Sequence, residues 1–310
     1  MEARINHNQL KFLLEKCWKN KVAIFVFGKS GVGKSQTIKE WAINKAKELN
    51  KQFVDFVEIG SKYEEIKKEP EKYFVFADIR LLLYNPDDIK GLPVFSNSAV
   101  EWKLPKEIEI FTVNGVSGVM FLDELNLAPQ FVQNIAYQIT LDRKINGKKI
   151  SDNVLIVSAG NLSTEKAYTY ELPEPLKKRM LIVVLDVDVD GFVRYAKERN
   201  IDNRIIAYLL FRNEALWQES TSNESNAPSP RQWEMLSNLI KGENDLEIIK
   251  LLAIATIGAK FGIDFYNFCK EAVEVEKYIK EPKLLEKDYE NKRIDKVYAV
   301  IGAIVDLSLI

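Results

Sequence analysis

The phosphate-binding pattern GxxxxGK[ST] is matched at every fixed position by residues 28–35, GKSGVGKS. Its glycines leave room for backbone N–H groups to point at phosphate oxygens. Lys34 can reach the β- and γ-phosphates, and the hydroxyl of Ser35 can ligate Mg²⁺. An apolar run, Val22 to Phe27, precedes the pattern and predicts a buried strand, and a helical period follows it. The residues expected to bind a nucleoside triphosphate are Gly28, Lys29, Ser30, Gly31, Val32, Gly33, Lys34, Ser35 and Gln36.

Two acids, Asp123 and Glu124, follow an apolar run at 118–122 that predicts another buried strand. Ligands of open α/β sheets bind at the carboxyl ends of the strands, where these acids would lie. Asp123 can hold Mg²⁺ together with Ser35, and Glu124 can orient and activate a water for attack on the γ-phosphate. An acid pair alone could equally be a solvated strand end, so the interpretation depends on the phosphate-binding pattern.

Three further polar residues could complete the site, and each has a simpler alternative. Asn161 ends the apolar run NVLIVSAGN and could hydrogen-bond the γ-phosphate and the attacking water, or merely form a turn. Arg179 could stabilise charge on a transferred phosphoryl group, or belong to a solvated basic cluster. Arg231 follows Ser229 and Pro230, a good helix start, and could move onto a phosphate or lie on a helix surface. The expected catalytic residues are Lys34, Glu124, Asn161, Arg179 and Arg231.

Composition sets the broad class. The 310 residues are 46% hydrophobic and 29% charged, which suits one large or two modest domains with a real core. Because 44 basic residues face 45 acidic ones, the formal net charge is −1, and overall charge gives no argument for binding nucleic acid or membrane.

Cysteine and histidine usage narrows the chemistry further. Cys17 and Cys269 are far apart and neither belongs to a CxxC pair, so we expect no disulfide framework, no zinc site and a reducing compartment. The single histidine, His7, is expected on the surface of an exposed leader, which disfavours Ser-His-Asp hydrolysis unless His7 itself serves. No apolar run predicts a secretory signal or a membrane span, so we expect a cytoplasmic protein with no membrane contact.

Strand-like and helix-like stretches alternate over the first part of the chain, which predicts a parallel α/β sheet. Residues 61–72 are rich in charge and are expected to be a solvated spacer. Strands are predicted at 22–27, 52–60, 73–84, 118–124, 153–161 and 181–187, and helices at 8–19, 36–49 and 128–142.

Two segments interrupt this alternation, and a change of pattern divides the chain. Residues 85–117 contain three prolines and short β-like runs, which indicate an irregular insertion that could include a hairpin. Asn146-Gly147 predicts a tight hairpin within about 143–152. The strand signal ends near residue 190, so we expect a nucleotide-binding core at 1–190 and a helical domain at 191–310.

Taken together, the motifs resemble those of the AAA+ ATPase superfamily, and more closely its MoxR-like branch with related phage and archaeal ATPases that carry a helix-2 insertion. The likeness covers about residues 20–240, with GKSGVGKS matching Walker A and VMFLDELN matching Walker B. Asn161 in SAGN matches sensor 1, Arg179 in LKKRM the arginine finger, and Arg231 in SPRQ sensor 2. The resemblance implies an α/β fold: a P-loop NTPase parallel-sheet core of AAA+ type with a C-terminal all-helical lid domain.

The resemblance also implies an activity and partners. Members of this superfamily use ATP and Mg²⁺, form homo-oligomeric rings that are usually hexamers, and remodel a protein client, often together with a von Willebrand A-domain protein. We therefore expect Mg²⁺-dependent ATP hydrolysis coupled to a chaperone-like task. Residues 241–310 match nothing beyond a helical pattern, so the client stays open.

Other functions remain possible from the sequence. A nucleic-acid motor, such as a DNA translocase or helicase-like ring, would use the basic residues Arg143, Lys144, Lys148 and Lys149 around the predicted hairpin turn. The simpler interpretation is a charged edge hairpin protected against aggregation. A monomeric phosphotransferase of the kinase type and a nucleotide-gated scaffold are also compatible with the phosphate loop, although the acid pair favours water as the nucleophile.

Overall fold

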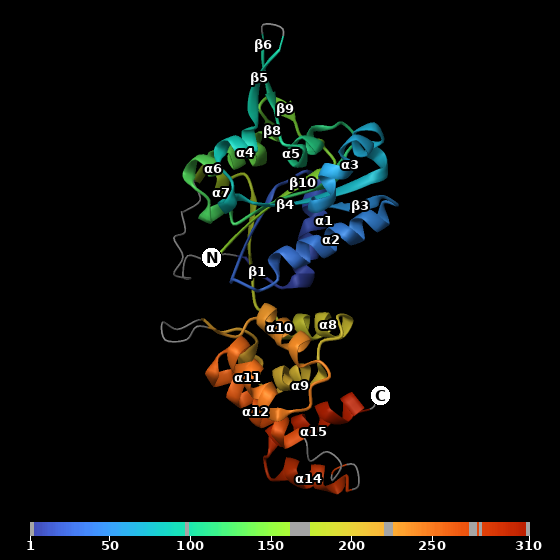
Figure 1. Ribbon diagram of the computed structural model, residues 1–310, viewed down its shortest axis with the longest axis vertical. Coiled ribbons are helices and arrows are strands. Elements are labelled where there is room, and N and C mark those ends of the chain that lie inside the picture. Colours follow the sequence, from blue (N-terminus) through green and yellow to red (C-terminus); the bar gives the residue numbers. More distant parts are fainter. Residues whose placement is uncertain are drawn as a thin grey trace. The chain divides into compact units, whose positions relative to one another are not determined.

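The computed structural model describes residues 3–96, 99–161, 174–219, 226–272, 278 and 281–307 (Figure 1). Contacts divide the chain into two units, described separately below: unit 1 is Met1–Lys29 with Gly33–Asp186, and unit 2 is Ser30–Val32 with Val187–Ile310. Residues 97–98 of the predicted insertion and residues 220–225 of the predicted helical domain lie outside the described residues. Within the described ranges, no helix is both long and apolar enough to cross a bilayer.

Unit 1 is built on a seven-stranded sheet in which all neighbouring strands are parallel. The central strands are buried along almost their whole length, as expected where helices cover both faces of a parallel sheet. The order across the sheet is β1 (Arg4–Ile5), β11 (Leu181–Leu185), β2 (Ile24–Gly28), β10 (Val154–Asn161), β7 (Ser117–Asp123), β4 (Tyr73–Arg80) and β3 (Gln52–Asp55). The main helices of the unit are α1 (His7–Asn20), α2 (Lys34–Glu48), α3 (Phe56–Lys68) and α6 (Gln130–Tyr137).

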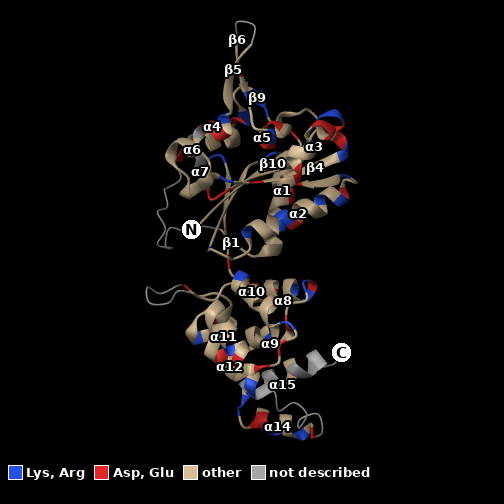
Figure 2. Cartoon of the chain, in the orientation of Figure 1, with Lys and Arg blue, Asp and Glu red and all other residues tan. Residues whose placement is uncertain are grey.

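The prediction for residues 52–72 is wrong. The strand ends at Asp55, and the expected spacer at 61–72 is mostly the helix α3, along which Figure 2 colours both acidic and basic residues. Asp55 and Glu58 form a capping box, in which each side chain accepts a hydrogen bond from the backbone of the other's position. Ile59, Tyr63 and Ile66 then bury one face of the helix at helical spacing.

The start of the chain also differs from the prediction of an exposed leader. The short strand β1 pairs with β11, with Ile5 opposite Leu185, and Arg4 forms an ion pair with Asp186. Asn6 caps α1 through a capping box with Gln9. The residues just before the helix are therefore part of the sheet edge.

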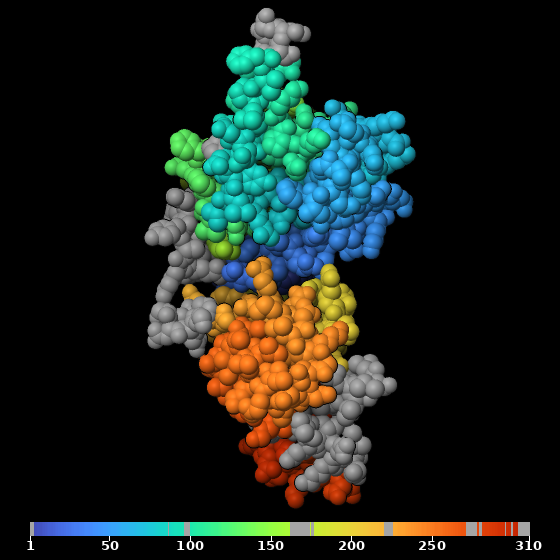
Figure 3. All heavy atoms as spheres, viewed as in Figure 1, coloured from blue at the N-terminus to red at the C-terminus, as the bar shows by residue number. Residues whose placement is uncertain are grey.

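Two hairpins lie outside the main sheet. The segment after β4 contains α4 (Pro86–Lys90), the antiparallel pair β5 (Leu92–Ser96) and β6 (Ala99–Lys103), and α5 (Lys106–Glu109). The β5–β6 pair projects from the rest of unit 1 (Figures 1 and 3). The second pair, β8 (Lys144–Ile145) with β9 (Lys148–Lys149), turns at Asn146 and Gly147, whose positive φ angles of 46° and 78° suit a type I′ turn.

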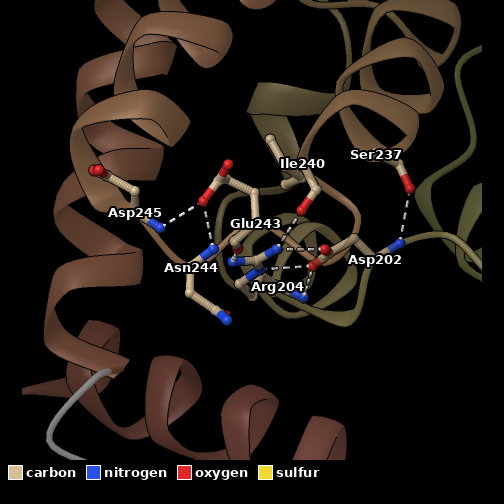
Figure 4. Close-up of polar contacts among 7 residues, drawn as sticks. All are labelled: Asp202, Arg204, Ser237, Ile240, Glu243, Asn244 and Asp245. Atoms are coloured by element: carbon tan, nitrogen blue, oxygen red, sulfur yellow. Dashed lines mark hydrogen bonds and ion pairs between the residues drawn. The ribbon is translucent and has the colours of Figure 1, made fainter.

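Unit 2 is helical in its described part. An aromatic cluster of Tyr208, Trp233 and Phe265 fills its core. Arg204 joins its helices: the guanidinium pairs with Asp202 and donates to the carbonyl oxygens of Ile240 and Glu243 (Figure 4). The helices are α8 (Val189–Glu198), α9 (Asn203–Phe211), α10 (Pro230–Ile240), α11 (Leu246–Ile257), α12 (Ala259–Ala272), α14 (Lys283–Glu290) and α15 (Ile294–Leu307).

The fold class predicted from the sequence is thereby confirmed. Unit 1 is an α/β parallel sheet that carries the phosphate-binding pattern between a strand and a helix, and unit 2, which follows it in sequence, is helical in its described part. Near-continuous apolar runs determine the central strands, and the glycine-rich pattern lies between the central strand β2 and the helix α2.

Candidate nucleotide-binding site

The phosphate loop occupies residues 29–33, between the end of β2 at Gly28 and the start of α2. Gly31 and Gly33 have φ angles of +73° and +96°, which side chains with a Cβ rarely adopt. Because Gly33 is the N-cap, the unsatisfied N–H groups of the first turn of α2 lie beside the loop. This local geometry provides what an anion site at a helix N-terminus requires.

Lys34 is buried at the first position of α2 and is surrounded by oxygen atoms. Its ammonium group donates to the carbonyl oxygens of Gly28 at 2.8 Å and Lys29 at 3.1 Å, and to Asn161 Oδ1 at 3.0 Å. These contacts hold one positive charge at the carboxyl edge of the sheet. Phosphate oxygens would compete with neutral acceptors for that charge, since hydrogen bonds between ionised groups are stronger.

The two side chains expected to hold Mg²⁺ meet in this structure. Ser35 Oγ donates to Asp123 Oδ2 at 3.0 Å, and the other carboxylate oxygen of Asp123 accepts from the backbone N–H of Glu124 at 2.9 Å. Adjacent ligands of an octahedral Mg²⁺ ion lie about 2.9 Å apart, given metal–oxygen distances of about 2.0–2.1 Å. The donor pair therefore fits the ion, and phosphate oxygens and water would supply its remaining ligands.

Glu124 has a backbone conformation that is unusual for its residue type. Its φ and ψ angles are 57° and 31°, in the left-handed region, and it opens the 3₁₀ turn Leu125–Leu127. A non-glycine residue held there costs of the order of 1–3 kcal/mol, and such residues cluster at functional sites. The turn directs the chain away from β7 immediately after the acid pair.

Asn161 ends β10 opposite Gly28 of the neighbouring strand β2. Its contact with Lys34 and the contact of Ser35 with Asp123 bring the ends of β2, β10 and β7 to one place. These strands are neighbours in the sheet, which is why residues so distant in sequence meet. Asn161, Lys34, Ser35 and Asp123 are thus brought together at the carboxyl edge of the sheet.

No contact with Lys34, Ser35, Asp123 or Asn161 is described for the three remaining predicted residues, Arg179, Arg231 and Gln36. Arg179 is exposed and follows the short helix α7 (Glu174–Lys177) in unit 1. Arg231 is exposed in the first turn of α10 in unit 2, where Ser229 caps the helix by accepting from the N–H of Gln232. Gln36 donates to Glu40 along α2. The roles of the two arginines stay predictions.

A carboxyl that sequence reasoning missed, Asp78, lies on β4 next to the Asp123 strand. Burial, and after it repulsion from the charge of Asp123, raise the pKa of Asp78 to about 6. Its Oδ1 atom is buried and has no hydrogen-bond partner among the described residues. The only signal in the sequence was an acid inside the apolar run YFVFADIR.

His7 was expected on the surface, and the structure corrects this. It begins α1, is half-buried, and lies against the phosphate loop, since a Cβ on Gly33 would be 3.2 Å from its Nε2 atom. The pairing of β1 with β11 brings the start of α1 to this place. No local sequence signal could have shown it.

Comparisons with known proteins give distant likenesses only. No protein-family model matches the chain, and no curated protein matches it. Among solved structures it is similar to NtrX from Brucella abortus in complex with ADP, at 19% identity and a TM-score of 0.40 over 76% of this chain and 50% of that one. It is also similar to C. elegans PCH-2, at 13% identity and a TM-score of 0.32 over 84% and 65% of the two chains. A third is the replication initiator DnaA bound to AMPPCP and single-stranded DNA, at 13% identity and a TM-score of 0.37 over 86% and 67%. The chain spans half the length of the NtrX chain.

Proposed function

We propose that this protein is a Mg²⁺-dependent ATPase of the AAA+ superfamily, MoxR-like, that forms a homo-oligomeric ring and remodels a protein partner. The observation that carries the ATPase is the meeting of two hydrogen-bonded pairs, Lys34 with Asn161 and Ser35 with Asp123, at one edge of the sheet. A loop that only joined a strand to a helix would not need this convergence of a buried ammonium, a hydroxyl and a carboxylate.

The residues have distinct tasks in this proposal. Lys34 holds the terminal phosphates, while Ser35 and Asp123 hold Mg²⁺, which would offset negative charge on the phosphates. Glu124 accepts a proton from the water whose oxygen forms the new bond to the γ-phosphorus, and ADP leaves as the old P–O bond breaks. Asn161 orients that water or the γ-phosphate through its amide. These phosphate contacts do not distinguish ATP from GTP.

Ring formation and the protein client have less support in the structure than ATP hydrolysis has. Arg179 is exposed, as a residue that acts on a nucleotide in a neighbouring subunit must be before assembly. Arg231 is proposed to act on a phosphate of the nucleotide on the basis of the resemblance. A hexamer and a von Willebrand A-domain partner follow from the resemblance alone and are proposed on that basis. A cytoplasmic location is proposed from the sequence pattern, in which no apolar run predicts a secretory signal or a membrane span.

The surface of unit 1 favours a protein client over nucleic acid. Facing residues of an antiparallel pair share one side, so Pro93, Phe95, Val100 and Trp102 form one apolar side of the β5–β6 hairpin. Phe95 is 86% exposed and Trp102 is 42% exposed. Such a surface suits apolar protein segments rather than a phosphate backbone.

The basic hairpin offers less to a nucleic-acid motor than its sequence indicates. The guanidinium of Arg143 donates to the carbonyl oxygens of Ser151 and Val154. Lys148 forms an ion pair with Glu109, and Lys149 forms one with Asp152. The nucleic-acid motor remains the second candidate, and stimulation of ATP hydrolysis by DNA with a steep salt dependence would favour it.

The substitution Glu124→Gln tests the proposed function. We expect the variant to bind ATP with wild-type affinity and to hydrolyse it at least about 100-fold more slowly, because the general base is lost. Glu64→Gln, an exposed change on α3, is the matched control and should hydrolyse ATP at the wild-type rate. Light scattering of the Glu124 variant in ATP should show a ring. Hydrolysis by Glu124→Gln near the wild-type rate would refute the assigned mechanism.

A further inference from the structure

We propose that Asn126 is a positioning residue of this site: its side chain holds the backbone of Asn161, so that the Asn161 amide is kept at Lys34. The inference rests on the proposed function. Asn126 lies in the turn Leu125–Leu127 and is 2% exposed. Its Nδ2 donates to the carbonyl oxygen of Asn161 at 2.8 Å, and its Oδ1 accepts from the N–H of Asn161 at 3.1 Å. The two contacts also fix which end of the amide is nitrogen.

These two hydrogen bonds take the place of backbone pairing that the end of β10 does not have with β7. Pairing between β10 and β7 ends at Ser158 opposite Leu122, whereas pairing between β10 and β2 continues to Asn161 opposite Gly28. In a parallel sheet, the N–H and C=O of one residue point toward the same neighbour. The amide of Asn126 therefore occupies the place that a longer β7 would have taken beside Asn161. Without it, the partly buried N–H and C=O groups of Asn161 would lose these partners.

Gly160 is the second feature that fits this arrangement. A Cβ at this position would lie 2.3 Å from Asn126 Oδ1 and 2.9 Å from Phe25 Cζ. Both distances are too short for real contacts, so the residue before Asn161 leaves the room that the amide of Asn126 needs. The contact between the turn and β10 therefore depends on a residue of each segment: Asn126 in the turn and Gly160 in the strand.

The hydrogen bonds of Asn126 affect the groups proposed to act on the phosphate. The Asn161 side chain can lie 3.0 Å from the Lys34 ammonium only if its own backbone is held in place. Asn126 lies two residues after Glu124, so the same turn that places the proposed base also places the Asn161 amide. Misplacement of a catalytic group by about 1 Å can cost about 100-fold in rate. Asn126 thus acts on the reaction without touching substrate.

The test replaces the amide by an apolar side chain of similar size. Asn126→Leu should lower kcat about 10- to 100-fold while the Kd for nucleotide changes by less than about three-fold, because positioning and not binding is lost. Gln133→Leu is the matched control. Gln133 is also 2% exposed, and it donates to the carbonyl oxygen of Ala128 and accepts from the hydroxyl of Tyr137, away from Asn161. It should keep kcat within about two-fold of wild type.

A double variant separates positioning from general damage. If Asn126 acts through Asn161, then Asn126→Leu combined with Asn161→Ala should be no slower than Asn161→Ala alone. Amide hydrogen exchange of the segment 154–161 gives a readout that needs no activity, and Asn126→Leu should accelerate it. Asn126→Ser, which removes both contacts without adding bulk, serves if the leucine variant does not fold.

The outcomes are distinguishable. Unchanged kcat in an active Asn126 variant, additive losses in the double variant, or unchanged exchange would each overturn the role of Asn126. Failure of the wild-type protein to hydrolyse ATP, or wild-type hydrolysis by Glu124→Gln, would instead overturn the proposed function. In that case the exchange measurement still decides whether Asn126 holds the backbone of Asn161.

Discussion

Replacing Asp78 by asparagine should stabilise the nucleotide-free protein at neutral pH, because the fold disfavours an ionised carboxylate at this position. The side chain lies on β4, and its buried Oδ1 has no hydrogen-bond partner in the described part of the chain. Burial is the main cause of its raised pKa, and repulsion from Asp123 adds to it, while Arg80 and Lys39 act in the opposite direction. Asparagine keeps the shape and removes the charge.

The size of the effect follows from the pKa. A rise from the ordinary value of 3.8 to about 6 corresponds to about 3 kcal/mol against the ionised form. Asp78 is only partly buried, so solvent screening reduces the expected gain to about 1–2 kcal/mol. The folded state holds the proton more tightly than the unfolded state, so the penalty is complete above about pH 6 and disappears as the pH falls toward 3.8. The advantage of Asp78→Asn should shrink over the same interval.

Urea unfolding of wild type and Asp78→Asn measures the difference in their free energies of unfolding. The difference at about pH 7.5 gives the stabilisation, and the difference at about pH 4 shows whether the stabilisation disappears. Asp152→Asn is the matched control, because Asp152 is exposed and its ion pairs with Lys21 and Lys149 favour the ionised form. That change should give no gain at neutral pH. An Asp78→Asn variant that is no more stable than wild type at neutral pH, or whose advantage persists at about pH 4, would refute the electrostatic reasoning.

Two further predictions concern the packing of unit 1 and the cysteines. Asp55→Ala removes the cap of α3 and the ion pair with Lys39, so it should lower the free energy of unfolding by about 1–2 kcal/mol, and an unchanged urea midpoint would contradict the assigned cap. Burial raises the pKa of the Cys17 thiol to about 11 and that of Cys269 to about 12, so at about pH 8 neither should react readily with Ellman's reagent in the native protein, while both should react after denaturation. Rapid reaction of a native thiol would show that one of these side chains is not buried.

The parts of the fold that could be predicted from sequence are those determined by neighbouring residues. The apolar runs at 22–27 and 153–161 predict the buried strands Ile24–Gly28 and Val154–Asn161, because parallel strands covered on both faces need almost no polar residues. The failure at 52–72 came from Asp55, which ends a strand and caps a helix at once, so that Phe56 and Val57 were assigned to the strand. The D-F-V-E pattern at 55–58 is the sequence signal of this capping box.

Other features depend on partners that only the folded chain supplies. The strand β1 contains one large apolar residue, Ile5, and exists because β11 pairs with it. That pairing places His7 beside Gly33, although the intervening sequence resembles an exposed leader.

The contrast between Asp123 and Asn126 shows where motif reasoning ends. The carboxylate of Asp123 points toward Ser35 because a strand presents its last side chains at the edge of the sheet, and the chemistry of the motif suffices to predict this. The position of Asn126 in the same motif predicts nothing by itself. Its contacts follow from a difference in length, since β10 continues beside β2 beyond the point where its pairing with β7 ends. Asn126 is close to the acid pair in sequence, but Asn161 lies 35 residues further along the chain. The two residues meet only because β10 extends beyond the last residue that pairs with β7.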